Sequence, residues 1–98
     1  CFGADTGLGA LMRRLAARRA SAPAGSYTKK LFETPDLLAA KLTEEAGELV
    51  EARDRAHVVH EAADVLFFTL ARLAAEGIDL AEVERHLDLR ALKLTRRG

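Results

Sequence analysis

Four carboxylates lie within the short stretch "EEAGELVE", which we interpret as part of a helix. At about 100° per residue, Glu44, Glu48 and Glu51 fall on one side of such a helix. Glu45 lies beside them, at the edge of the apolar side. For this helix alone, an ordinary solvated face in which Lys41 pairs with one acid, worth about 0.3 kcal/mol, is a sufficient explanation. A chemical interpretation comes only from the segment that follows.

A second pair of acids, Glu61 and Asp64, interrupts the apolar stretch "HEAADVLFFTLARLAA". Apolar residues cover nearly all sides of the helix predicted here, so we expect it to be buried from most directions. A buried carboxylate is costly unless it is paired, protonated or bound to a cation. Lys41 or an arginine is one possible partner. A divalent cation is the other, because four or five acids facing one another across two helices would repel.

Oxygen ligands alone favour a hard ion, and Mg²⁺ is the usual one where phosphate groups complete its coordination. The acids therefore predict a site for phosphate chemistry. A di-iron bundle needs Glu-x-x-His, but Val83 lies three residues before His86. His57 and His60 in "HVVHE" fit neither zinc-peptidase pattern, and we expect all three histidines at the surface or an interface. The sequence has no Gly-x-x-x-x-Gly-Lys phosphate loop.

The elements that position these acids are predicted to be helices. Ala, Leu, Glu and Arg dominate the composition, and residues that favour strands never alternate over a useful length. Thr34 and Pro35 mark one helix start, Gly77 marks a helix end, and Asp79 with Glu82 forms an acidic capping box. The fold class is therefore all-α. The helices are expected at residues 10–19, about 35–53, about 56–76, and from 79 until the chain frays into "KLTRRG".

The chain is 98 residues long, which is the size of one small domain. Fifteen basic and fifteen acidic residues cancel, so the total charge predicts no nucleic acid and no membrane partner. The lone Cys1 forms neither an internal disulfide nor a zinc framework, which favours a reducing, cytoplasmic setting. A start at cysteine suggests processing, trimming or a piece of a longer protein. Three principal helices bury little surface alone, so we expect a homodimer.

The acidic segments carry a resemblance to a known family. "KLTEEAGELVEA" followed by "HEAADVLFF" resembles the Glu-Glu-x-x-Glu and Glu-x-x-Asp signature of all-α nucleoside triphosphate pyrophosphohydrolases. The flanking "GSYTKKLFETPDLLAAK" and "GIDLAEVERHLDLR" are similar to the phosphoribosyl-ATP pyrophosphohydrolases of histidine biosynthesis, over about residues 21–96. The resemblance implies a helical bundle with about four helices per chain, completed by dimerisation.

The chain looks most like the version found in multifunctional histidine-pathway proteins. Residues 1–20 would then be a linker or remnant of a preceding cyclohydrolase-like domain with a helix, and Cys1 would match one of its zinc-binding cysteines. Residues 21–98 would form the pyrophosphohydrolase domain, covalently linked to other pathway domains. Two positions depart from the family: Gly47 weakens the acidic helix by about 1 kcal/mol, and His60 replaces a larger apolar or aromatic residue.

The resemblance also implies a reaction, which is hydrolysis of the α–β phosphoanhydride of phosphoribosyl-ATP to phosphoribosyl-AMP and pyrophosphate. It assigns Mg²⁺ binding to the four acids Glu45, Glu48, Glu61 and Asp64. Glu44 would complete the metal coordination or activate the attacking water, alongside Glu45 and Glu48 as catalytic residues. The number of metal ions and the acid that activates water stay open.

Basic and hydroxyl side chains are expected to meet the phosphates of the substrate. For the lysine pair of "SYTKK" an ordinary solvated loop is an equal alternative, and "SYT" by itself suggests a helix start. The role of the basic C-terminal tail stays open. The expected substrate-binding residues are Ser26, Tyr27, Thr28, Lys29, Lys30, Lys41, Lys93 and Arg96.

Two other functions remain as alternatives. A general or house-cleaning nucleoside triphosphate pyrophosphohydrolase would share the acids and would not need "GSYTKKLF". A non-catalytic helical dimerisation module would keep the leucines and tolerate neutral substitutions of the acids. Activity toward phosphoribosyl-ATP, compared with other triphosphates and with an acid-to-amide variant, separates the three.

Overall fold

The chain folds into five helices, with no strand among the residues that are described. A computed structural model describes residues 6–21 and 23–97, with side chains up to residue 92. The all-α prediction is confirmed, whereas the expected number of about four helices is one too low. The helices are α1 (Gly7–Ser21), α2 (Tyr27–Glu33), α3 (Pro35–Glu51), α4 (Arg55–Ala75) and α5 (Leu80–Arg97).

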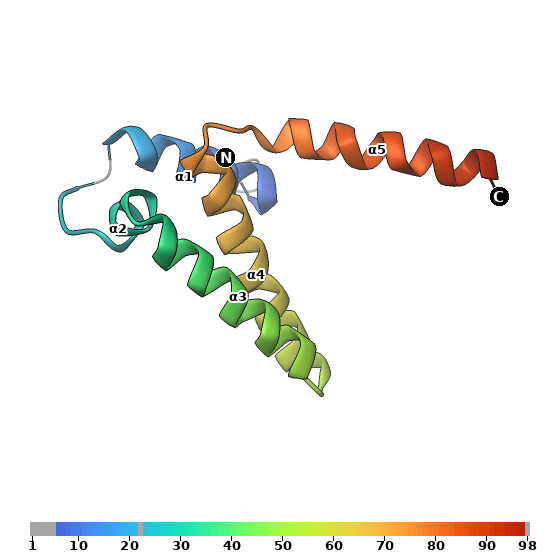
Figure 1. Cartoon of the computed structure of the whole chain (residues 1–98), viewed down its shortest axis with the longest axis horizontal. Coiled ribbons are helices and arrows are strands. Elements are labelled where there is room, and N and C mark those ends of the chain that lie inside the picture. The colour runs from blue at the N-terminus through green and yellow to red at the C-terminus, as the bar shows by residue number, and fades with distance from the viewer. Residues whose placement is uncertain (1–5, 22, 98) are drawn as a thin grey trace.

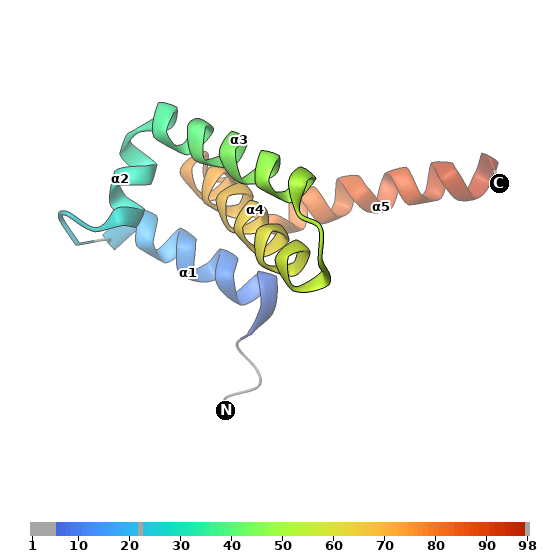
Figure 2. The same cartoon turned by 90° about the horizontal axis from the view of Figure 1, so that it is seen from below.

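Helices α3 and α4 form an antiparallel hairpin, whose connecting end points away from α1 and α2 (Figure 1). Helix α1 packs against α4, and the short α2 contacts α1, α3 and α4. Helix α5 leaves the end of α4 and extends away from the other four helices, as Figures 1 and 2 show from two directions. The single chain is therefore a small helical body with one projecting helix.

Two clusters of buried apolar side chains hold the body together, one between α1 and α4 and one that joins α2 and α3 to α4. Phe67 packs against both clusters, and its ring meets that of Phe68 edge-on at 5.1 Å between centroids. The α4 members all come from its C-terminal half, and Glu61 is the buried residue of the other half. The clusters consist of Met12, Leu15, Leu70 and Ala74, and of Leu31, Leu38, Phe68 and Ala71.

The predicted helix-end signals lie where expected. Pro35 occupies the first turn of α3 after Thr34, although the Thr34 side chain makes no capping hydrogen bond. Gly77 ends the α4 region with φ of 73°, a left-handed conformation that glycine adopts without steric cost. The backbone N–H of Asp79 donates to Glu82 Oε2 over 3.4 Å, which is the capping-box contact.

The structure corrects two further expectations about the helices. Residues 27–33 form a separate helix, because Ser26 Oγ accepts from the N–H of Lys29 over 3.1 Å and Thr34, restricted by the proline that follows, ends it. Helix α5 continues to Arg97 instead of fraying into the basic tail. Leu, Lys and Arg are good helix formers, which explains the continuation.

The N-terminal half of α4 is more exposed than its apolar sequence predicts. Val58 and Val59 are 39% and 63% exposed, and Leu66, just past the midpoint of the helix, is 43% exposed. Burial from most directions is therefore wrong for the single chain, because α3 is the helix that chiefly covers this half and it covers one side.

Candidate metal and substrate site

The predicted acids lie on the α3–α4 hairpin, about two helical turns from the connection at residues 52–54. Glu45 is 9% exposed and Glu61 is 5% exposed, so the two acids placed on the packing side are indeed buried. Ligand atoms of two residue groups lie within 4.8 Å of one another in each group. The groups are Glu44, Glu45 and Glu48 on α3, and His60, Glu61 and Asp64 on α4.

Acids of both helices raise the pKa of Glu45. Burial is the largest cause that raises the pKa of Glu45 from 4.5 to about 7, followed by the carboxylates of Glu48 and Glu61, with a contribution from Asp64. Glu48 lies on the same helix, but Glu61 and Asp64 belong to α4. The hairpin therefore brings together carboxylates that are distant in the sequence.

One of the two carboxylate oxygens of Glu61 has a hydrogen-bond partner. Its Oε2 lies 3.2 Å from His57 Nε2, whereas its Oε1 is buried and has no hydrogen-bond partner among the described residues. A buried acceptor without a partner is costly, and here it lies among other carboxylates. The carboxylates of both helices supply oxygen donors, and one of these oxygens is buried and unsatisfied; a hard divalent cation prefers such oxygen ligands, so these acids fit Mg²⁺.

Two histidines pair with acids of α4, a feature that the sequence analysis missed. His57 pairs with Glu61, and His60 Nε2 lies 3.4 Å from Asp64 Oδ2. Their side chains are 48% and 70% exposed. The signal is present in "HVVHEAAD", where each histidine precedes an acid by four residues and therefore lies on the same face of the helix.

Lys41 lies next to the acids and pairs with the outermost one. Its Nζ is 3.3 Å from Glu44 Oε2, and this hydrogen bond is the main cause that raises the pKa of Lys41. The charge of Tyr27 on α2 contributes in the same direction, so the start of α2 lies close enough to act on Lys41. The hairpin thus carries a basic group and a phenol beside its carboxylates.

The remaining predicted substrate residues have local roles in the structure. Ser26 caps α2, and Lys29 Nζ lies 3.0 Å from Glu33 Oε2, as the helix-start interpretation expects. Thr28 is half-buried, and Lys30 and Glu51 are exposed. Cys1 lies outside the described residues, as do the side chains of Lys93 and Arg96. No described contact links these residues to the carboxylates of α3 and α4.

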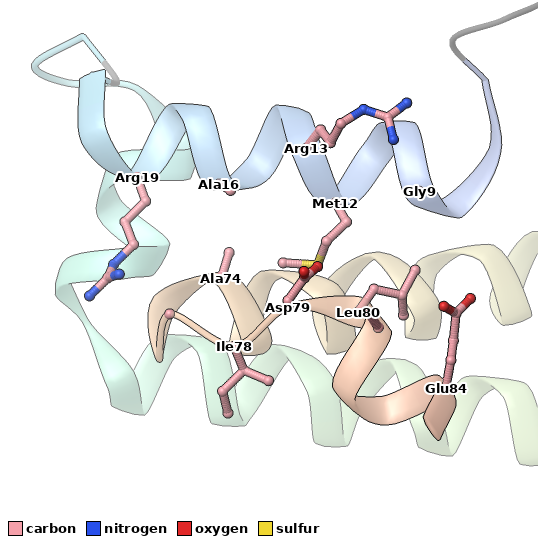
Figure 3. Close-up of a pocket in the computed structure, with 12 residues that line it drawn as sticks. Gly9, Met12, Arg13, Ala16, Arg19, Ala74, Ile78, Asp79, Leu80 and Glu84 are labelled. Atoms are coloured by element: carbon pink, nitrogen blue, oxygen red, sulfur yellow. The ribbon is translucent and has the colours of Figure 1, made fainter. Parts of the chain in front are cut away.

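A cavity of about 560 Å³ lies at the other end of α4, between α1, the end of α4 and the start of α5 (Figure 3). Met12, Ala74 and Leu80 give it an apolar floor, and Asp79 and Glu84 add carboxylates at its α5 side. None of the predicted site residues lines it. This cavity and the acidic site are separate features of the molecule.

Comparison with known proteins identifies the family. The family model described as phosphoribosyl-ATP pyrophosphohydrolase matches residues 8–91, starting within α1, while the domain boundary predicted at residue 20 stays a prediction. The chain is 50% identical over 97 residues to the histidine biosynthesis trifunctional protein of Komagataella pastoris, covering 99% of this chain and 12% of that protein. It is 45% identical over 97 residues to the bifunctional protein of Schizosaccharomyces pombe, covering 99% of this chain and 23% of that protein.

A short relative matches over most of its length. The phosphoribosyl-ATP pyrophosphatase of Rhodobacter capsulatus is 43% identical over 90 residues, covering 88% of this chain and 87% of that protein. The chain thus spans a small part of its multifunctional relatives and nearly the whole of a single-domain one. The chain belongs to the phosphoribosyl-ATP pyrophosphohydrolase family.

Proposed function

We propose that the chain catalyses the Mg²⁺-dependent hydrolysis of phosphoribosyl-ATP to phosphoribosyl-AMP and pyrophosphate, the second step of histidine biosynthesis. The observation that carries this proposal is the set of carboxylates from α3 and α4 around buried Glu45 and Glu61, with one buried oxygen unsatisfied. The family membership supplies the substrate, since the matched short relative is named a phosphoribosyl-ATP pyrophosphatase.

The metal would be held by Glu45 and Glu48 from α3 and by Glu61 and Asp64 from α4. A cation held there would supply positive charge that offsets the negative charge developing on the leaving pyrophosphate. Without a cation, repulsion among the four acids lowers the stability of the hairpin. The fold nevertheless keeps the acids in place for a metal ion.

We assign the orientation of the attacking water to Glu44. Its side chain is 55% exposed and its Oε2 lies 3.3 Å from Lys41 Nζ, at the edge of the acidic cluster where water has access. Lys41 and Tyr27 would then meet the polyphosphate or the base on the same side. Lys30, Lys93 and Arg96 are further candidates for the ribose phosphate. Catalysis by this arrangement relies on positioning and electrostatics, with no covalent enzyme intermediate.

Pyrophosphate release from phosphoribosyl-ATP tests the proposal. Activity should require Mg²⁺, and Asp64→Asn should lower kcat/KM by a factor on the order of a hundred or more, because a metal ligand is lost while the shape is kept. Circular dichroism of the variant checks that the helices remain. An Asp64→Asn variant with wild-type activity would show that the metal assignment is wrong.

A substrate panel separates the alternatives. Equal turnover of ordinary nucleoside triphosphates and phosphoribosyl-ATP would replace this proposal with a general pyrophosphohydrolase. Absence of Mg²⁺-dependent pyrophosphate release from all of them, with an intact fold, would favour the non-catalytic helical module.

We also propose that two copies of the chain form a dimer. The accessible surface is 7295 Å², against about 5,500 Å² expected for a compact monomer of this mass. The radius of gyration is 15.5 Å, whereas roughly 12.6 Å is typical of 98 residues. The exposed apolar residues of α4 and α5 account for part of the excess, and a second copy would cover them.

We propose that the chain is covalently linked to other histidine-pathway domains, as in the multifunctional relatives. Among the described residues, no helix combines the length and the apolar character needed to cross a membrane. A cytoplasmic location stays a prediction.

A further inference from the structure

We propose that His57 is a positioning residue for the acidic site: it donates its Nε2–H to Glu61 Oε2 and so holds the carboxylate with Oε1 directed to the cation. This inference rests on the proposed function, because it needs a cation between α3 and α4. It concerns a residue that touches neither substrate nor metal and acts through Glu61.

The first support is the difference between the two oxygens of Glu61. Nε2 of His57 lies 3.2 Å from Oε2, while Oε1 is buried without a partner among the described residues. The Glu61 side chain is 6% exposed, so water has little access to replace the histidine. A carboxylate that accepts one fixed hydrogen bond presents its other oxygen in one direction, which is how outer partners orient metal ligands.

The second support is that the backbone of His57 is itself anchored. Asp54 is the N-cap of α4, and its Oδ1 accepts from the N–H of His57 over 2.8 Å. The cap fixes the first turn of the helix, and the imidazole then reaches one turn forward to Glu61. Asp54, His57 and Glu61 thus form a chain of contacts that starts at the end of the hairpin and ends at the acids.

The third support is that His57 is not among the candidate ligands. The two groups whose ligand atoms lie within 4.8 Å of one another contain His60 and five acids, and His57 is in neither. A hard ion prefers oxygen over imidazole. The position of His57 therefore favours a role in holding a ligand over a role as a ligand.

His60 provides a matched comparison on the same helix. It pairs with Asp64 at the same four-residue spacing, 3.4 Å apart, but the two side chains are 70% and 39% exposed. Water can take the place of His60 at such an exposed carboxylate, whereas loss of His57 would remove the hydrogen-bond partner of Oε2 on a buried one. The two histidines should therefore differ in importance despite their equal spacing.

Mg²⁺ titration of the metal-free chain by calorimetry tests this difference. His57→Ala should weaken Mg²⁺ binding about tenfold or more, the usual effect of removing an outer partner of a metal ligand. His57→Gln should restore most of the affinity, because its amide N–H₂ reaches the same oxygen. His60→Ala should change the affinity less than His57→Ala does. All variants retain the backbone N–H of residue 57, which donates to Asp54 Oδ1 in the wild type.

Two more measurements separate positioning from a purely structural role. In the activity assay, His57→Ala should need more Mg²⁺ for half-maximal rate and recover most of kcat at saturating Mg²⁺. In NMR spectra of the metal-free wild type, the His57 imidazole should be the tautomer protonated on Nε2. A kcat loss that Mg²⁺ does not recover, or a tautomer protonated on Nδ1, would contradict the inference.

The outcomes distinguish this inference from the proposed function. If the wild type binds Mg²⁺ and His57→Ala binds it equally well, the inference fails and the metal site stands. Equal losses in His57→Ala and His60→Ala would also overturn it. If the wild type binds no Mg²⁺ in the presence or absence of pyrophosphate, the proposed metal site fails, and the role of His57 toward a cation fails with it.

Discussion

The protonation state of Glu45 affects both the stability of the fold and the binding of a cation. It is buried beside like charges, which raises its pKa from 4.5 to about 7. Burial alone favours the protonated form, and the carboxylates of Glu48 and Glu61 act in the same direction. A cation between the helices would favour the ionised form and reverse this preference. The same residue should therefore make the metal-free fold sensitive to pH.

We predict that the metal-free chain loses stability as pH rises from 4.5 to 7. In this window the folded state keeps the proton of Glu45 while the unfolded state has lost it, so the free energy of unfolding falls with increasing pH. Urea unfolding across the window, with Glu45→Gln as control, measures the effect. The free energy of unfolding of Glu45→Gln should depend less on pH. Excess Mg²⁺ should reduce the loss of stability in the wild type. Stability that rises through the window equally in both proteins would contradict the assigned pKa.

Helix α3 carries the acids on a sequence that is not optimised for helix stability. Gly47 lies in its interior, has no left-handed backbone, and no atom lies within 4 Å of a Cβ built there. Gly77 differs, because its φ of 73° is a conformation that side chains disfavour, and the Arg19 side chain lies 3.1 Å from an added Cβ. The backbone conformation at position 77 therefore favours glycine, whereas position 47 of the single chain has room for a side chain.

We expect opposite effects from alanine at these two positions. Gly47→Ala should raise the free energy of unfolding by about 1 kcal/mol through helix propensity. Gly77→Ala should lower it by at least about 1 kcal/mol, because the left-handed conformation becomes strained. Thermal and urea unfolding of the single chain measure both. If Gly47→Ala is destabilising and also weakens self-association, a second copy approaches α3 closely at this position.

The molecule as a whole exposes more surface than a compact monomer of its mass, and large apolar side chains are part of that surface. Helix α5 projects from the body (Figure 1), and its Leu87, Leu89 and Leu92 are each more than half exposed. Leu80 at its base packs against the α1–α4 cluster. Leu87 continues the side that Leu80 begins, while Leu89 lies nearly opposite on the helix. This continuous side is the part of α5 most suited to meet a second copy.

Analytical ultracentrifugation should show a dimer that Leu87→Glu dissociates. A charge placed in a buried apolar interface costs enough to raise the dissociation constant on the order of a hundredfold. Leu89→Glu is the matched control, since Leu89 is 53% exposed in the single chain and Leu87 is 55% exposed. It should weaken the dimer less. A wild type that stays monomeric at all concentrations would contradict the proposed dimer.

Local signals in the sequence determined the fold class, most helix ends and the two acidic segments. The four predicted helices end within three residues of those observed, apart from the extension of α5, because Pro35, Gly77 and the Asp79–Glu82 box act on their own backbone neighbours. The acids share helix faces for a similarly local reason, which is the helical period. The family likewise follows from residues that stand close together in the sequence.

The tertiary structure alone decided how these segments meet. It set α2 apart as a separate helix, left half of α4 exposed, and placed Glu45 against the acids of α4. It also showed that Glu61 has one held and one unsatisfied oxygen. These facts depend on distances between residues that are far apart in the chain and on what covers each side chain. Burial and unpaired oxygens are properties of the packed molecule, and no spacing along a single helix contains them.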